Sequence, residues 1–259
     1  MTYHRPVLLQ ECIEGLNINP KGIYVDVTFG GGGHSKEILK HLTCGKLYSF
    51  DRDSDVLQNL IEDDNFKLIQ TNYKNIKRFL RLEGVKKIDG ILADLGVSSH
   101  QFDVPERGFS FRFDADLDMR MNVSSELTAR SVLNEYSRED LANVFFNYGE
   151  IRQSRKAANL IVKYRESEEI KTTSDLVDIL GGLVPEKRRS QFLSQVFQSI
   201  RIEVNDEIES LKMMLMDSVS LLNDGGRFVV MSYHSLEDRL VKNLFKRGGF
   251  SGEVEKDFF

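Results

Sequence analysis

Residues 23–35 read Ile-Tyr-Val-Asp-Val-Thr-Phe-Gly-Gly-Gly-Gly-His-Ser, and this stretch determines how the rest of the chain is interpreted. An apolar, β-branched run ends in four glycines and is followed by helical spacing, which predicts a strand, a tight turn and a helix N-terminus. Glycines accept positive φ and let a ligand approach the backbone, while the first N–H groups of the helix are free to bind it. The stretch therefore predicts a cofactor-binding loop, although an ordinary turn between a strand and a helix has a similar pattern.

The composition predicts a soluble globular protein. The chain has 259 residues, 41% of them hydrophobic, which is enough for one large core or for a core and a smaller domain. No apolar run approaches the roughly 20 residues of a spanning helix, and the N-terminus lacks the apolar segment of a signal peptide. Cys12 and Cys44 have no disulfide or metal-ligand spacing. We expect a cytoplasmic protein with no metal site and no membrane partner.

Strands and helices alternate over the first hundred residues and again near the end. The predicted strands begin at Ile23 and then cover residues 46–51, 66–72, 88–96 and 227–234. Helices are predicted between them at 35–42, 55–61, 75–82 and 205–222, with a last helix at 236–246. This alternation indicates a parallel, doubly wound α/β sheet. Ligands of such sheets bind outside the carboxyl ends of the strands, and the glycine loop, Asp51, Tyr73 and Asp94 all fall there.

The acid at the end of the second predicted strand narrows the choice of cofactor. Asp51 lies about 20 residues beyond the glycine strand, where a carboxylate can bind both ribose hydroxyls of a nucleoside. Alternatively it caps the next helix, a role that Asp53 or Ser54 could fill equally well. The GxGxxG pattern of dinucleotide-binding loops is incomplete, because Ser35 stands at the third glycine position. The loop thus better suits a nucleoside with a small charged tail than a nicotinamide dinucleotide.

Several longer blocks then match one family. They are HRPVLLQE, DVTFGGGGHS, DRD, DLGVSSHQFD, RGFSFR, DLDMRM, VFQSIRIEVNDE and SYHSLEDRLVK. In these blocks the chain closely resembles the S-adenosylmethionine-dependent methyltransferases of the RsmH/MraW family, which modify the exocyclic N4 amine of a cytidine in the decoding region of 16S ribosomal RNA. The resemblance implies a Rossmann-like class I methyltransferase sheet, S-adenosyl-L-methionine as cofactor, and small-subunit ribosomal RNA or the assembling small ribosomal subunit as partner. A homodimer is left open.

The resemblance also implies which residues form the site. The cofactor-binding residues would be Gly32, Gly33, His34, Asp51, Tyr73, Asp94 and Gln101. On the side of the target base, the resemblance points to Asn205, Tyr233 and His234, with Tyr233 stacking on a cytosine turned out of its helix and Asn205 reading its edge. Many amino-methyltransferases hold the target amine with an Asp/Asn-Pro-Pro-Tyr/Phe motif, but residues 94–97 read Asp-Leu-Gly-Val. That Asp94 orients the amine is therefore a hypothesis.

The alternation of strands and helices stops between residues 105 and 199. Only helices are predicted there, at 127–133, 139–146, 151–165, 174–183 and 188–200. We interpret 105–199 as an all-helical insert for RNA recognition, inserted into a methyltransferase domain of residues 1–104 and 200–259. The net charge of −5 requires RNA to be held by a local basic patch. Candidate phosphate-binding residues are Arg152, Arg155, Lys156, Lys163 and Arg188. A solvated helix face is the alternative.

The chain ends at Phe259, before the residues from which the family forms a last antiparallel hairpin. We therefore expect either that the chain is a fragment or that the sheet is completed in an unusual way, and an open edge at the fifth strand would favour aggregation. Two other functional classes remain open at this point. They are a nicotinamide-dependent oxidoreductase and a ribosome-assembly factor without catalytic activity.

Overall fold

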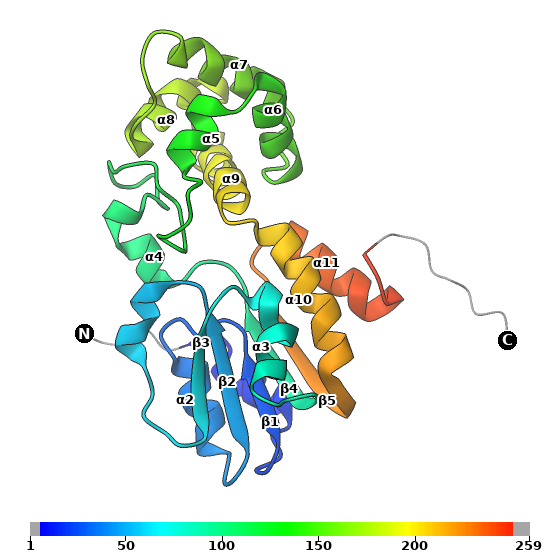
Figure 1. The fold of residues 1–259 in the computed structure, drawn as a ribbon. Coiled ribbons are helices and arrows are strands. Elements are labelled where there is room, and N and C mark those ends of the chain that lie inside the picture. The colour runs from blue at the N-terminus through cyan, green and yellow to red at the C-terminus, as the bar shows by residue number, and fades with distance from the viewer. Residues whose placement is uncertain (1–5, 251–259) are drawn as a thin grey trace, which may run out of the picture. The chain divides into compact units, whose positions relative to one another are not determined.

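The computed structural model describes residues 6–250, which form two compact units (Figure 1). Unit 1 combines the chain up to Gly96 with the chain from Ile208 onward, and unit 2 is Val97–Glu207. Each unit has its own hydrophobic core. Within the described residues, no helix is both long enough and apolar enough to cross a membrane.

Unit 1 contains a parallel sheet with the strand order β3-β2-β1-β4-β5. Its strands are β1 (Ile23–Asp26), β2 (Lys46–Asp51), β3 (Phe66–Gln70), β4 (Ile88–Asp94) and β5 (Leu222–Met231). The order reverses between β1 and β4, since β1 also pairs with β2 on its other side. The predicted doubly wound α/β architecture is confirmed, and its switch point lies at the end of the strand that leads into the glycine loop.

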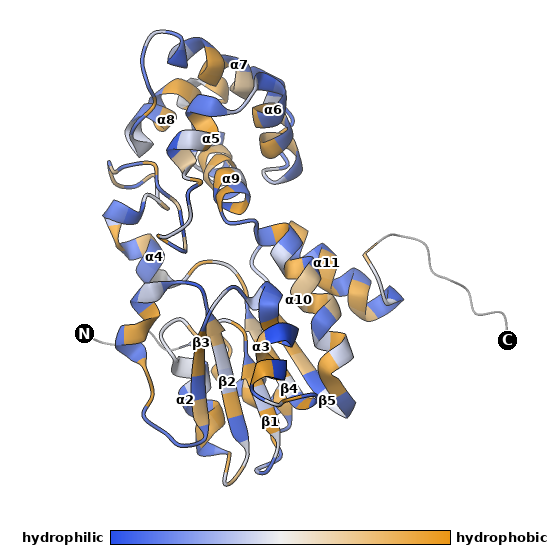
Figure 2. Cartoon of the chain, viewed as in Figure 1, coloured by the Kyte–Doolittle hydropathy of each residue, from blue (hydrophilic) through white to orange (hydrophobic). Residues whose placement is uncertain are grey.

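Helices cover both faces of this sheet. They are α1 (Leu9–Leu16), α2 (Gly33–Lys40), α3 (Ile76–Leu82), α10 (Glu207–Leu221) and α11 (Ser235–Arg247), with 3₁₀ turns η1 (Ser54–Asn59) and η2 (Tyr73–Asn75). Neighbouring strand residues point to opposite faces. Val25 packs in the core that includes α3, α10 and α11 residues, and Tyr24 packs in the core formed with α1 and α2. Hydrophobic residues accordingly recur along the strands in Figure 2.

Some element boundaries differ from the sequence-based expectation. β5 begins at Leu222 and ends at Met231, whereas we expected a strand over 227–234. Its pairing with β4 shifts register between Ile88 and Gly90, where Asp89 lies opposite residues 223–226, so the turn with Gly225 and Gly226 forms an irregularity inside the strand. The helix expected at 55–61 is the 3₁₀ turn η1. Within residues 6–250, no strand pairs with the outer side of β5.

Unit 2 is helical, as the predicted fold class requires. Its elements are α4 (Ser99–Asp103), η3 (Pro105–Arg107), α5 (Ala129–Glu135), α6 (Arg138–Asn147), α7 (Ser154–Arg165), α8 (Thr173–Leu180), η4 (Gly181–Leu183) and α9 (Glu186–Val204). The core packs α5, α6, α7 and α8 around α9 through buried aliphatic and aromatic side chains such as Phe145, Ile161 and Val196. α9 continues to Val204, four residues beyond the predicted end at 200.

Candidate functional site

The glycine loop after β1 is held by side chains from the next strand and the turn after it. Gly30 and Gly32 have φ of 49° and 74°, a backbone region that favours glycine. The Gly30 N–H donates to Asp51 Oδ2 at 2.9 Å, and Asn59 Nδ2 donates to the Gly30 carbonyl at 3.1 Å. Asp51 therefore supports the shape of the loop directly.

The second oxygen of Asp51 also has a backbone partner. Asp51 Oδ1 accepts from the Asp53 N–H at 2.9 Å, and Asp53 in turn caps η1 by accepting from the Asp55 N–H at 3.1 Å. The helix-cap role considered for Asp51 thus belongs to Asp53. Burial raises the pKa of Asp51, although the hydrogen bonds from Asp53 and Gly30 act in the opposite direction. Ribose binding by Asp51 stays a prediction, and each of its oxygens keeps one further lone pair for it.

Gly33 and His34 begin helix α2 and lie against the N-terminal segment. A Cβ atom on Gly33 would overlap the ring of Pro6. His34 is 6% exposed, and its Nε2 lies 3.1 Å from the Val7 carbonyl oxygen. Its Nδ1 lies 3.9 Å from Asp94 Oδ2. The structure therefore brings two of the predicted cofactor-binding residues, His34 and Asp94, together at the switch point.

Asp94 ends β4 and is hydrogen-bonded to one residue that follows β1 and one that follows β5. Its N–H donates to Thr28 Oγ1 at 2.7 Å, and its Oδ1 accepts from the Tyr233 hydroxyl at 2.7 Å. Burial raises the pKa of Asp94, while the Tyr233 hydrogen bond and the nearby His34 act to lower it. Tyr233 follows β5 and is 56% exposed, so its ring is available at the surface of unit 1 while its hydroxyl is held.

The structure adds one residue that the sequence reasoning missed. Asp26, the last residue of β1, is 1% exposed. Its Oδ1 accepts from the Thr28 N–H at 3.0 Å, and its Oδ2 accepts from the Ser35 hydroxyl at 2.6 Å. One buried carboxylate thus joins the two ends of the glycine loop. A sequence signal was present, because an acid interrupts the apolar run 23–29.

Ser35 explains why the third glycine of the dinucleotide pattern is absent. Its hydroxyl bonds to Asp26 and also lies 2.8 Å from the hydroxyl of Ser49 on β2. A glycine here would lose both contacts. Helix α2 is therefore attached to β1 and β2 by side-chain hydrogen bonds at the position where dinucleotide-binding loops rely on close backbone packing.

The remaining predicted residues of unit 1 have structural contacts of their own. Tyr73 follows β3 at the start of η2 and packs partly buried against the core. His234 caps α11, since its Nδ1 accepts from the Glu237 N–H at 3.4 Å, and its Nε2 lies 3.2 Å from Glu237 Oε1. These contacts give His234 a helix-capping role. Its catalytic role stays a prediction without support from them.

Gln101 and Asn205 lie in unit 2. Gln101 is buried and completes the capping box of α4, with its Oε1 accepting from the Ser98 N–H. Asn205 is also buried. Its Oδ1 accepts from the Met121 N–H at 2.8 Å, and its Nδ2 donates to the Met119 carbonyl at 2.7 Å and to the Arg201 carbonyl at 2.8 Å. These contacts use both amide hydrogens, so they do not support base reading by Asn205, which stays a prediction.

The predicted phosphate-binding residues are exposed. Arg152 precedes α7, and Arg155, Lys156 and Lys163 lie on it, while Arg188 lies in the first turn of α9. Within residues 6–250 none of these five side chains has an ion-pair or hydrogen-bond partner. Other cations of unit 2 are paired, for example Arg130 with Glu169 and Arg138 with Glu139.

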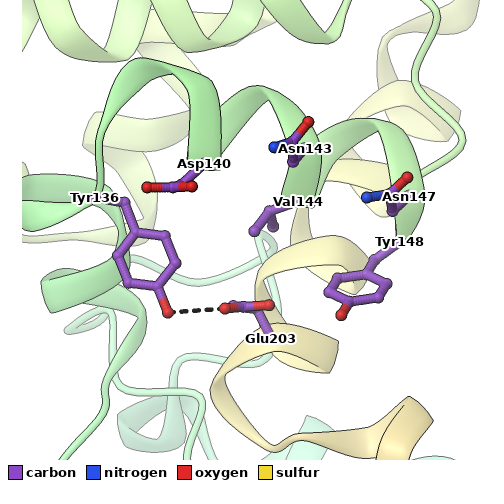
Figure 3. Close-up of a pocket in the computed structure, with 7 residues that line it drawn as sticks. All are labelled: Tyr136, Asp140, Asn143, Val144, Asn147, Tyr148 and Glu203. Atoms are coloured by element: carbon purple, nitrogen blue, oxygen red, sulfur yellow. Dashed lines mark hydrogen bonds between the residues drawn. The ribbon is translucent and has the colours of Figure 1, made fainter.

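Unit 2 also contains a cavity of about 360 Å³ beside α6 (Figure 3). It is lined by Tyr136, Asp140, Asn143, Val144, Asn147, Tyr148 and Glu203. The two tyrosine rings stand on opposite sides of Val144, and the Tyr136 hydroxyl donates to Glu203 Oε1 at 2.7 Å. No residue from the predicted site lines this cavity.

Comparison with known proteins identifies relatives over the whole chain. The family described as MraW methylase family matches residues 1–257. The Ribosomal RNA small subunit methyltransferase H of Flavobacterium johnsoniae is 57% identical over 260 residues, which cover 100% of this chain and 86% of that protein. The protein of the same name from Cytophaga hutchinsonii is 54% identical, with 99% and 87% covered. Among solved structures, an rRNA methylase from Streptococcus thermophilus is 19% identical, with a TM-score of 0.29 over 45% of this chain and 72% of that one.

Proposed function

Because the chain belongs to the MraW methylase family, we propose that it transfers a methyl group from S-adenosyl-L-methionine to the exocyclic N4 amine of a cytidine in the decoding region of 16S ribosomal RNA. The relatives' names support small-subunit ribosomal RNA as the substrate. The observation that carries the chemistry is the Asp94 carboxylate at the switch point, beside the glycine loop and hydrogen-bonded to Tyr233. The same proposal places the protein in the cytoplasm with the small ribosomal subunit or its RNA.

The residues of unit 1 fit such a cofactor. A Cβ on Gly30 would have only the Thr28 carbonyl oxygen near it, at 4.0 Å, so this side of the loop is open to a ligand. Asp51 offers carboxylate lone pairs for a ribose diol, and Asp94 offers a carboxylate for an amino group. When bound, S-adenosylmethionine supplies a methyl group already attached to a good sulfonium leaving group. The protein's part is then to hold and orient the groups that react.

Asp94 is the residue best placed for that task. The amine of cytosine is a weak nucleophile because its lone pair is delocalised into the ring, so the site must orient it and accept its hydrogens. The Tyr233 hydroxyl occupies Oδ1 of Asp94 and leaves Oδ2 as the free oxygen. A carboxylate there also stabilises the positive charge that develops on the amine nitrogen. This arrangement needs no proline-containing motif after the acid.

The decisive experiment measures methyl transfer from labelled cofactor to small-subunit particles that lack the modification. Wild type should transfer, and Asp94→Ala should lose transfer by far more than it loses cofactor affinity. Equal losses would leave Asp94 a binding residue only. A wild-type protein that transfers nothing would contradict the enzyme proposal. Titration with NAD alongside S-adenosylmethionine separates this function from that of a nicotinamide-dependent oxidoreductase.

We propose that the unpaired basic residues of unit 2 bind the RNA phosphates. Side chains that no carboxylate neutralises can bind phosphates and release counterions. Reversing charge at Arg155 and Lys156 should weaken RNA binding and reduce the slope of log affinity against log salt by about 1.5, since each lost phosphate contact removes roughly 0.7–0.9. Arg138→Glu is the matched control, because Arg138 is already paired with Glu139. An unchanged slope in the double variant would favour a merely solvated helix face.

A further inference from the structure

The segment of residues 6–8 is part of the glycine loop's surroundings. Pro6 packs against Gly33, where a Cβ atom would overlap its ring. The Val7 carbonyl oxygen lies 3.1 Å from His34 Nε2. Two successive residues thus contact two successive positions at the start of α2.

The contact between Val7 and His34 indicates which nitrogen of the imidazole ring carries a hydrogen. A carbonyl oxygen can only accept, so the hydrogen of this bond must be on Nε2. In a neutral ring Nδ1 is then an acceptor. Asp94 Oδ2 faces it at 3.9 Å, too far for a direct hydrogen bond.

Two acceptors at this separation suit a shared donor. A nitrogen with two hydrogens can lie about 2.9 Å from each of them and donate to both. An ammonium or amino group meets this requirement, whereas a phosphate or carboxylate would face only lone pairs. The other oxygen of Asp94 is taken by Tyr233, which leaves Oδ2 for this purpose.

We propose that the Val7 carbonyl is a positioning group of the ligand site: it holds His34 as the Nε2–H tautomer, so that His34 Nδ1 and Asp94 Oδ2 together bind an amino or ammonium group. This inference rests on the proposed function for the ligand, whose candidate groups are the ammonium of the cofactor and the amine of the target base. The tautomer itself is a property of the free protein.

The backbone after Val7 supports this assignment. Leu8 has φ of 48° and ψ of 36°, a left-handed conformation that is strained for leucine. It stands at the N-cap of α1, but its side chain makes no capping hydrogen bond and is 54% exposed. The strain is thus unexplained by capping or by burial of the side chain. It occurs at the peptide that carries the Val7 carbonyl, and strain of this kind is often retained at functional sites.

Leu8 provides a matched pair of variants. Glycine adopts positive φ freely, so Leu8→Gly should keep the Val7 carbonyl in place. Proline fixes φ near −65°, so Leu8→Pro should move it. Long-range ¹H–¹⁵N correlation spectra of the histidine rings report the tautomer in the ligand-free protein, and His34→Gln identifies the His34 signals among the five histidines. Wild type and Leu8→Gly should show the Nε2–H form alone, and Leu8→Pro a mixture. A wild-type ring protonated on Nδ1, or an unaltered ring in Leu8→Pro, would overturn the proposal.

Calorimetric titration then tests whether His34 Nδ1 and Asp94 Oδ2 together bind an amino or ammonium group, and it identifies the ligand that supplies this group. The His34→Gln side chain keeps an N–H donor for the Val7 carbonyl but has no acceptor at the position of Nδ1. This variant therefore still tests the proposal if Leu8→Pro fails to fold. Both variants should bind S-adenosylmethionine about tenfold more weakly if the cofactor's ammonium is the donor, with binding of 5′-methylthioadenosine, which lacks that group, unchanged. Unchanged cofactor affinity with about tenfold slower transfer at saturating cofactor would assign the donor to the target amine. No change in either measurement would refute joint binding of an amino group by His34 Nδ1 and Asp94 Oδ2. A wild type that binds no S-adenosylmethionine would instead refute the proposed function, and the tautomer spectra would still decide the role of Val7.

Discussion

Three buried or half-buried acids shape the carboxyl edge of the sheet. Asp26 joins the ends of the glycine loop, Asp51 holds Gly30, and Asp94 is attached to Thr28 and Tyr233. Burial raises the pKa of all three. Taking a carboxylate out of water costs free energy that its hydrogen bonds must offset. The loop is thus held by groups that are costly to bury and highly directional.

Asp26 predicts a measurable dependence of stability on pH. Because burial makes its pKa higher in the folded chain than in the unfolded one, the folded chain binds more protons, and its contribution to stability falls as the pH rises above about 3.9. Asp26→Asn should lower the unfolding free energy by about 2 kcal/mol at pH 4.5, since it leaves a buried group poorly paired. That deficit should shrink toward pH 8 in urea unfolding. A deficit that is constant with pH would show that Asp26 titrates alike in both states.

Tyr233 predicts a separation of catalysis from cofactor binding. Tyr233→Phe removes the hydrogen bond to Asp94 Oδ1 and frees this oxygen to rotate away from its position. Under the proposed function, methyl transfer should fall about tenfold or more, while the cofactor dissociation constant changes less than threefold. Because the Tyr233 hydrogen bond lowers the pKa of Asp94, its loss should raise that pKa. As the pH is lowered, the variant should therefore begin to lose activity at a higher pH than wild type. Equal losses in transfer and in affinity would mean that Tyr233 holds the cofactor.

At the scale of elements, the C-terminal end of α9 organises the segment around Met119 and Met121. Asn205 binds this segment with its side-chain amide, and Arg201 makes a bidentate pair with Glu207 at 2.9 Å and 2.9 Å. Asn205→Ala should therefore lower the stability of unit 2 by about 2–4 kcal/mol, because a buried N–H and C=O lose their partners. Cofactor affinity should be unchanged. Normal stability with lost methyl transfer would instead support the predicted reading of the base by Asn205.

The sequence predicted the helices and strands better than the roles of the polar residues that they carry. Hydrophobic periodicity, glycines and β-branched runs identified every strand of the sheet. The pattern is strongest in β1, β2 and β4, which are mostly buried. Which of Asp51 and Asp53 caps η1 could not be predicted, since both acids suit a cap and the tertiary contact of Asp51 with Gly30 decides. Asn205 illustrates the same limit. An amide after a helix can read a base or bind a distant main chain, and the partner lies 84 residues away.

At the scale of the whole molecule, the separate cores predict separate stabilities. The core of unit 2 contains Phe145, Ile161 and Val196, and the cores of unit 1 contain none of its residues. S-adenosylmethionine, for which all the predicted binding residues except Gln101 lie in unit 1, should stabilise that unit by about 2.7 kcal/mol at one hundred times its dissociation constant. Hydrogen exchange with and without S-adenosylmethionine should then slow about 100-fold for the slowest amides of β1 and β4. The slowest amides of α6 and α7 should slow much less. Equal protection in both units would mean that the chain unfolds as one cooperative body or that the cofactor also stabilises unit 2 through Gln101.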